Sequence, residues 1–476
     1  MATRLTRHLV WVPPASAPPA SASAKMRAAK ATPSLTALDT GREQPPSQEQ
    51  ANLDFFTEPR ERAVYLLHIG AEVEHALMVQ YLYAAYSLGG TQLTDPEHQR
   101  LAQAWRATIL EIAREEMGHL ATVENLLTLI GGPLSFERED YPIPTDLYPM
   151  PFELEPLTKK SLGKYVLLEM PNEKTIAALG LEEEMEEIRK YVDAEDDLTV
   201  HRVGIIYDAV AALFTPPVMP KDPKPAPPSF ISSSDIQAES LRFQVSPDEW
   251  GLGYHDLLIE TANDRTSALN AIKLISVQGE GSTIGDLDKS HFGKFLNIYR
   301  QFPNEGDWVP ARNVARNPTT DPDAPLDRRI TNKLALLWAG LLSLRYRMLL
   351  MYLSHAFRIE APLKASGRTP RGLLLSWTFG EMYNLRSITE ILMTLPLHEV
   401  GDEELLAGPP FEMPYSLALA SHDANRWRMH RDLLQASQQY VKALSEASGG
   451  QYENYLKGLH SANESALAQV LTLIGG

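Results

Sequence analysis

Apolar residues recur every three or four positions along most of the chain, and this period predicts helices. No segment shows the sustained alternation of a half-buried strand, so the fold is predicted to be all-α. The predicted helices span residues 58–88, 95–130, 158–170, 180–214, 262–278, 286–302, 327–359, 370–395, 414–447 and 451–474.

Helix-breaking residues divide the pattern into units. Gly89-Gly90 and Gly131-Gly132-Pro133 end the first two predicted helices, and the short turn between them predicts an antiparallel hairpin. Residues 133–156 show no period and predict an irregular loop over the mouth of a bundle. A second breaker at 216–228 contains seven prolines.

These boundaries predict a bundle over residues 56–310 and a C-terminal helical domain over 327–476 that packs on it. Residues 1–55 form a separate tail, whose first 38 residues contain no Asp or Glu and are rich in Ala, Ser and Pro. This composition predicts a disordered tail. We expect a cytoplasmic protein. The alternative is an Arg-bearing transit peptide and a mitochondrial location, if the source is eukaryotic.

One short repeat is present, because LTLIGG occurs at 127–132 and again at 471–476. Gly-capped, Leu-rich helix ends recur by capping physics alone, whereas a duplicated bundle would also produce the echo.

Charge and composition narrow the function. The net charge of -17 argues against nucleic acid as a partner, and the absence of Cys leaves His, Asp and Glu as strong metal ligands. The apolar window 334–353 contains Arg345 and Arg347, which indicates a buried helix rather than a membrane span. We expect a small organic substrate as partner, and a homo-oligomer is compatible with the sequence.

Two of the predicted helices carry an acid on their apolar face. Glu74 interrupts the stripe of the first helix, and Glu116 interrupts that of the second, where His119 lies one turn further on. A carboxylate on such a face is costly to bury unless it is paired or binds a metal. A Glu-x-x-His pair on one helix places both side chains on the same side, where one ion can bind them.

A single Glu-x-x-His is usually a solvated pair, and Glu111 and Glu115, which fall off the apolar stripe, are predicted to face solvent. The combination of Glu116 and His119 with an inward Glu74 across a hairpin favours a metal site.

Several segments resemble the ferritin-like proteins related to iminophenyl-pyruvate dimer synthase. They are HIGAEVEHALMVQYLYAAYSL (68–88), ILEIAREEMGHLATVENLLTLIGG (109–132), QGEGS (278–282), SHFGKFLNIYRQF (290–302) and AGPPFE (407–412). The resemblance implies a ferritin-like four-helix bundle with a dinuclear metal site and, in bisindole pathways, oxidative coupling of two amino-acid-derived imines. It also covers many proteins of unassigned activity. The implied metal ligands are Glu74, Glu116, His119, Glu280 and His291.

By the residues alone, Glu280 reads as part of a surface turn and His291 as a helix cap. Together they also fit a Glu-x-x-His pair opened by an insertion, with the carboxylate ending one helix and the imidazole starting the next.

The chain departs from the family pattern on the third bundle helix. Related sequences commonly have a Gly-Glu-x-Tyr stretch, whereas this chain has Gly204-Ile205-Ile206-Tyr207. Ile205 cannot bind a metal. Either His201 or Asp208, one turn away, substitutes for the missing ligand, or the site is degraded or mononuclear.

The leading hypothesis is therefore a non-haem iron or manganese oxidoreductase, mononuclear or dinuclear, that uses dioxygen or peroxide on a small, amino-acid-derived substrate. The alternatives are a metal-storing or metal-sensing bundle without turnover, and a pseudoenzyme whose C-terminal helices bind a partner. Glu381, His355 and His398 in the last third have no ligand spacing and are predicted to be structural.

Overall fold

The computed structural model describes residues 57–143, 152–193, 202–216, 230–251, 257–281, 287–304, 306–364, 366–400 and 404–475. Within these ranges the chain is helical and contains isolated β-bridges but no strand, so the all-α prediction is confirmed. The predicted tail at 1–55, and with it the transit-peptide alternative, lies outside the described residues.

The hairpin consists of α1 (Pro59–Ser87) and α2 (Pro96–Leu129), the two longest helices among the described residues. The Asp95 carboxylate accepts hydrogen bonds from the backbone N–H groups of Glu97 and His98, which would otherwise lack partners at the start of α2. The turn after α2 uses Gly131 at a φ of 66°, a conformation that favours glycine.

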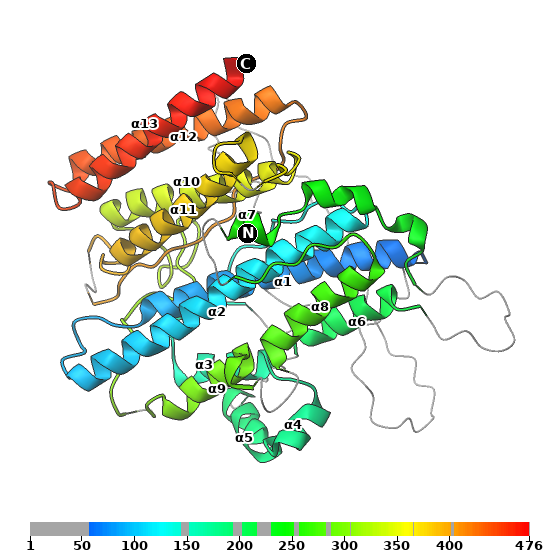
Figure 1. Cartoon of the computed structure of the whole chain (residues 1–476). Helices are drawn as coiled ribbons and strands as arrows, with labels where there is room; N and C mark the ends of the chain where they lie inside the picture. The colour runs from blue at the N-terminus through cyan, green and yellow to red at the C-terminus, as the bar shows by residue number, and fades with distance from the viewer. Residues whose placement is uncertain are drawn as a thin grey trace, which may run out of the picture.

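The other half of this bundle is made of helices that are broken in the middle. Helices α3 (Lys159–Leu168) and α9 (His291–Gln301) pack together near one end of the hairpin, and α6 (Gly204–Phe214) and α8 (Arg265–Glu280) pack together further along it (Figure 1). The backbone N–H of Val203 donates to the Leu168 carbonyl over 3.1 Å, so α6 starts where α3 ends.

The single helix predicted over 180–214 is wrong. The structure has α4 (Glu173–Leu179) and α5 (Glu182–Asp193) in an insertion, and α6 follows as a separate helix. Asn172 caps the start of α4, and Gly180 ends it at a φ of 68°. These local signals stop the chain from continuing as one helix.

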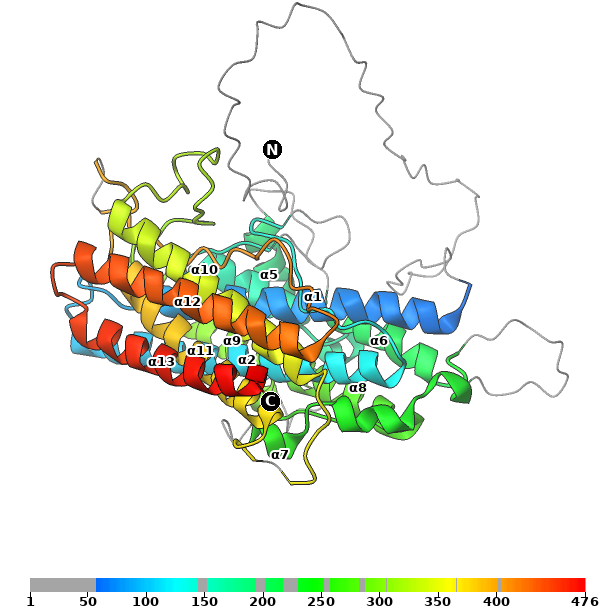
Figure 2. The same cartoon turned by 90° about the horizontal axis from the view of Figure 1, so that it is seen from above.

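The last third forms a second four-helix bundle, and the four predicted helices are confirmed as α10 (Lys333–Ala356), α11 (Pro370–Leu392), α12 (Asp423–Ala447) and α13 (Glu453–Gly475). Figure 2 shows α12 and α13 lying over α10 and α11. Helix α10 is long and apolar enough to cross a membrane, but 61% of its apolar window is buried inside the protein, as in a core helix.

Buried polar contacts join the two bundles. Arg371 of α11 is fully buried and donates to the Glu249 carboxylate of α7 (Pro247–Trp250) over 2.6 Å and to the Gln244 carbonyl over 2.7 Å. On α1, His75 hydrogen-bonds the Tyr346 hydroxyl of α10. Polar groups at such a junction need partners because water cannot reach them, so these contacts fix how the second bundle sits on the first.

Candidate metal centre

Two columns of helices pack against the hairpin, α3 with α6 and α8 with α9, and both are interrupted at the same level of the first bundle. Glu169 directly follows α3, Glu280 is the last residue of α8, and His291 is the first of α9. The breaks therefore place three chemically active side chains at the level of the acids of the hairpin. The cavity at this level is about 20 Å³, room for roughly one water molecule, and its walls are mainly apolar.

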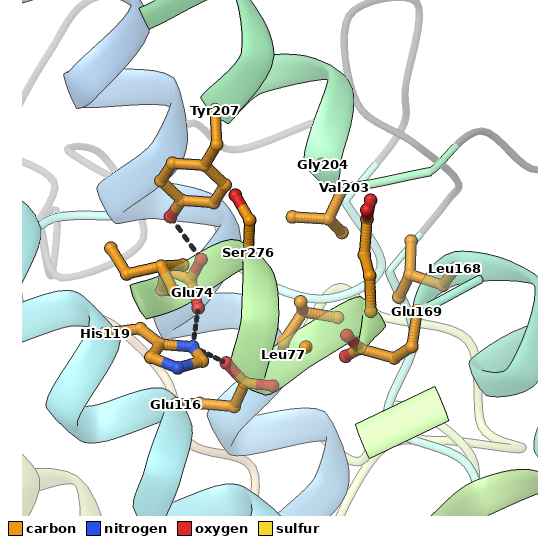
Figure 3. Close-up of a pocket in the computed structure, with 13 residues that line it drawn as sticks. Glu74, Leu77, Glu116, His119, Leu168, Glu169, Val203, Gly204, Tyr207 and Ser276 are labelled. Atoms are coloured by element: carbon orange, nitrogen blue, oxygen red, sulfur yellow. Dashed lines mark hydrogen bonds and ion pairs between the residues drawn. The ribbon is translucent and has the colours of Figure 1, made fainter. Parts of the chain in front are cut away.

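Five ligand-type side chains form two groups that share one carboxylate. The first group is Glu74, Glu116 and His119, and the second is Glu116, Glu169 and His291. Within each group, one ligand atom per residue lies within 4.8 Å of the others, and all these side chains are buried. Figure 3 shows Glu74, Glu116 and His119 converging, with Glu169 on the other side of the cavity. Glu116 is therefore placed to bridge two ions.

Both histidines present Nδ1 to the carboxylates. His119 Nε2 lies 3.0 Å from the amide oxygen of Gln278, and His291 Nε2 lies 3.1 Å from a Glu115 oxygen. Because these oxygens accept hydrogen bonds, the ring protons are assigned to Nε2. The Nδ1 lone pairs then face the cluster. A partner that holds the distal N–H is the usual companion of a metal-binding histidine.

One contact indicates that this cluster is built for a cation. His291 Nδ1 lies 2.9 Å from Glu116 Oε1, yet the two atoms are not aligned as a hydrogen bond, and each is buried without a hydrogen-bond partner. Unpaired buried polar atoms are rare in folded proteins and call for an explanation. Two lone-pair donors converging on one point fit a metal ion, so the residues present suit the group that the fold implies.

The buried acids and histidines of the two groups also shift one another's pKa values. Burial and the neighbouring Glu116 charge raise the pKa of Glu74 to about 7. Burial works against protonation of His119, but Glu116 and Glu74 outweigh it and raise the pKa to about 10. Without a metal, protons therefore hold the carboxylates together. A divalent ion would displace those protons, which couples binding to pH.

Two tyrosines orient the acids from behind. The Tyr207 hydroxyl donates to Glu74 Oε1, and the Tyr81 hydroxyl donates to Glu169 Oε1 over 2.6 Å. Both rings are buried. Each hydrogen bond occupies one carboxylate oxygen and so leaves the other for an ion.

The structure brings together four of the five ligands predicted from the sequence: Glu74, Glu116, His119 and His291. The fifth, Glu280, lines the same cavity but belongs to neither group, because its Oε1 is paired with the Arg202 guanidinium. Glu280 is placed beside the site, as the opened-motif interpretation required, but is directed away from the other ligands.

The carboxylate of the third column, which the family pattern would place at position 205, belongs to a different residue. Ile205 is half-buried and does not line the cavity, and the carboxylate at this level is Glu169. Asp208, a proposed substitute, has a side chain that is 71% exposed and is paired with Arg202, and His201 lies outside the described residues. The insertion after Glu169 separates it from the Gly-x-x-Tyr stretch, so linear spacing pointed to the wrong residue.

The prediction for the two off-stripe acids was half right. The Glu111 side chain is 51% exposed, whereas that of Glu115 is only 15% exposed and contacts His291 and Lys294. Helix α9 covers Glu115, and a pattern on α2 alone cannot show this. The signal that was available is that Glu115 directly precedes Glu116.

The acid and histidines of the last third have partners of their own. Glu381 accepts from Arg345 over 2.7 Å, His355 contacts Asp423 and His430, and His398 lies 3.0 Å from the Thr331 hydroxyl. Within the described residues, none of the three joins a group that could hold a metal.

Comparison with known proteins supports the ferritin-like fold through one family model and finds two similar curated proteins. The family model described as Ferritin-like matches residues 67–300. Dichlorochromopyrrolate synthase of Lentzea aerocolonigenes is 27% identical over 403 residues, covering 74% of this chain and 36% of that protein. The 2-imino-3-(indol-3-yl)propanoate dimerase of Chromobacterium violaceum is 26% identical over 389 residues, covering 73% and 33%. The chain thus spans about a third of the length of these relatives.

A crystal structure of a ferritin like protein from Caulobacter vibrioides aligns with 70% of this chain and 96% of that chain, at 20% identity and a TM-score of 0.37. The fold assignment rests on the family match and on the helices themselves.

Proposed function

From the match of residues 67–300 to the Ferritin-like family model, the two similar relatives and the ligand cluster, we propose that the chain is a non-haem iron or manganese oxidoreductase with a dinuclear centre. The observation that carries the proposal is the pair of ligand groups that share Glu116. Mixed carboxylate and imidazole ligands suit iron and manganese, and three protein ligands per ion leave positions open.

The bound metal would supply electron exchange with dioxygen or peroxide. The chain's own residues do the rest. Gln278 and Glu115 hold the two imidazole rings by their Nε2 protons, and Tyr207 and Tyr81 hold the outer carboxylates. Leu77, Leu168 and Ile275 line the cavity and exclude water, which strengthens every electrostatic contact inside it.

The substrate we propose is a small amino-acid-derived molecule, following the names of the two relatives. Joining two imines through one new bond removes two electrons and two protons, and one dioxygen can accept both as hydrogen peroxide. The protein then needs only to bind the imines and keep competing water out. This activity stays a proposal, since the chain spans only about a third of each relative.

The test is anaerobic reconstitution with ferrous iron or manganese, followed by dioxygen uptake in the presence of imines that an amino-acid oxidase generates from phenylalanine or tryptophan. We expect a coupled dimer and metal-dependent oxidant consumption. Glu116→Ala should abolish both, whereas Glu111→Ala, which changes an exposed acid on the same helix, should leave both unchanged.

Tight metal binding without oxidant consumption would instead support a storage or sensing protein. A chain that binds no metal under these conditions would support the pseudoenzyme.

A further inference from the structure

One ion pair at the metal cavity has no role in the proposed centre. Arg202 contacts Glu280 Oε1 through Nη1 and Asp208 Oδ2 through Nη2, the latter over 3.1 Å. The Arg202 side chain is 14% exposed, and the Asp208 side chain 71%. The guanidinium therefore lies between the buried cavity and the surface, with one carboxylate on each side.

Glu280 is in a position to move. It is the last residue of α8, and Gly281 after it has a φ of 74°, so no further helical turn constrains the side chain. It lines the same cavity as Glu74, Glu116 and Glu169 but joins neither ligand group. Arg202 is the partner that holds Glu280 apart from them.

The lack of a side chain at Gly204 leaves room for the Glu280 carboxylate beside Arg202. A Cβ atom at residue 204 would lie 1.7 Å from Glu280 Oε1 and 2.6 Å from its Cδ, which is impossible without displacing the carboxylate. The φ of Gly204 is not positive, so the backbone itself does not demand glycine. The glycine is needed here for the space that the Glu280–Arg202 pair occupies.

Charge then determines what can enter. Four carboxylates line the cavity, and they repel an anionic substrate unless a cation compensates. His119 and His291 face the ligand groups through Nδ1 and are not available for this purpose. Arg202 is the described cation that touches a cavity-lining residue, and its planar fork matches a carboxylate with two parallel hydrogen bonds.

We propose that Arg202 binds the carboxylate of the substrate and that Glu280 is the internal carboxylate displaced from it. The inference rests on the proposed function and names its substrate class, a small organic acid. Exchange of one carboxylate for another keeps the guanidinium paired, so it does not leave a buried charge without a partner. The released Glu280 carboxylate would then be free to act as a further metal ligand beside the two groups.

The experiment compares 3-phenylpropionate with its uncharged amide, 3-phenylpropanamide, by calorimetry on the full chain. Both the metal-free protein and the protein loaded with zinc, which cannot be oxidised or reduced, are titrated. The wild type should bind the acid on the order of tenfold more tightly than the amide. Arg202→Gln should remove this preference, and Arg202→Lys should restore only part of it because an ammonium cannot form the fork.

Glu280→Ala supplies the opposite change. It removes the internal carboxylate that competes for Arg202 and should tighten binding of the acid several-fold, with no effect on the amide. Arg300→Gln is the matched control, because Arg300 pairs with Glu184 outside the cavity, and this variant should behave as wild type. Unchanged preference in Arg202→Gln, or unchanged or weaker acid binding in Glu280→Ala, would overturn the inference.

The two proposals fail separately. If the acid preference depends on Arg202 but the chain consumes no oxidant, the proposed oxidoreductase activity is wrong and the carboxylate-binding site stands. If the chain couples imines oxidatively and Arg202→Gln binds the acid normally, the carboxylate-binding site is wrong and the oxidoreductase activity stands.

Discussion

The two helix bundles of this chain bury charge in opposite ways. In the first, Glu74 and Glu116 are 2% and 1% exposed, and their basic partners are imidazoles, His119 for both acids and His291 for Glu116. In the second, the buried Glu381 accepts a hydrogen bond from Arg345 over 2.7 Å. Both regions are helix bundles. The interior of the second contains an arginine, whose positive charge is permanent, whereas the interior of the first contains imidazole protons that a metal ion can displace.

This difference separates a structural ion pair from a ligand set. A guanidinium stays charged and offers no lone pair, so Arg345 can only neutralise Glu381. An imidazole can lose its proton and become a ligand, and the carboxylates around it then remain for the ion. When the two LTLIGG segments are aligned, His119 falls on Asn463, which accepts a hydrogen bond from Arg345. The second bundle fills the equivalent position with part of its ion-pair network.

The largest expected effect is on the second bundle. Arg345→Ala leaves Glu381 buried without its cation, and we expect a loss of about 3–5 kcal/mol in the free energy of unfolding. Urea titration followed by circular dichroism measures it. Arg345→Met combined with Glu381→Leu removes both charges and should recover most of the loss. A single variant that lost less than about 1 kcal/mol would show that this pair is not what stabilises the second bundle.

The next effect is a pH dependence in the first bundle. Burial raises the pKa of Glu124 on α2 to about 8, although the Ser135 N–H lowers it, and its carboxyl group is therefore protonated at neutral pH. The unfolded value is 4.5, so the unfolded state loses the proton first and stability falls as pH rises from 4.5 to about 8.

Glu124→Gln should make the free energy of unfolding depend less steeply on pH, by up to roughly 1.4 kcal/mol per pH unit over this range. Unfolding titrations of both proteins at pH 5, 6, 7 and 8 test it. Parallel curves would mean that Glu124 ionises in the folded protein as readily as in the unfolded one.

The smallest expected change in stability is at the metal site itself. Near neutral pH, the Glu74 carboxyl group is protonated in part of the molecules, because burial and Glu116 raise its pKa to about 7. Glu74→Gln keeps the shape and removes a charge that the metal-free protein does not need. We expect the free energy of unfolding of the metal-free variant to stay within about 1 kcal/mol of wild type, while metal affinity falls. Strong destabilisation without metal would make Glu74 structural, like Glu381.

The sequence was most informative where local pattern decides structure. The hairpin, its glycine ends and the inward acids of α1 and α2 follow from helical period, and the prediction of the four C-terminal helices rests on the same signal. Glu169 could not be placed, because the insertion that carries α4 and α5 separates it from α6 along the chain. The Arg202–Glu280 pair and the burial of Glu115 depend on contacts between helices far apart in sequence, which period and spacing do not encode.

The most direct test of the central claim is the number of metal ions per chain, measured by elemental analysis after anaerobic reconstitution. If Glu116 bridges two ions, the wild type and Glu111→Ala should hold two, Glu169→Ala should hold one, and Glu116→Ala should lose both. Two ions retained in Glu169→Ala, or equal losses in Glu169→Ala and Glu116→Ala, would contradict a centre built from two ligand groups that share one carboxylate.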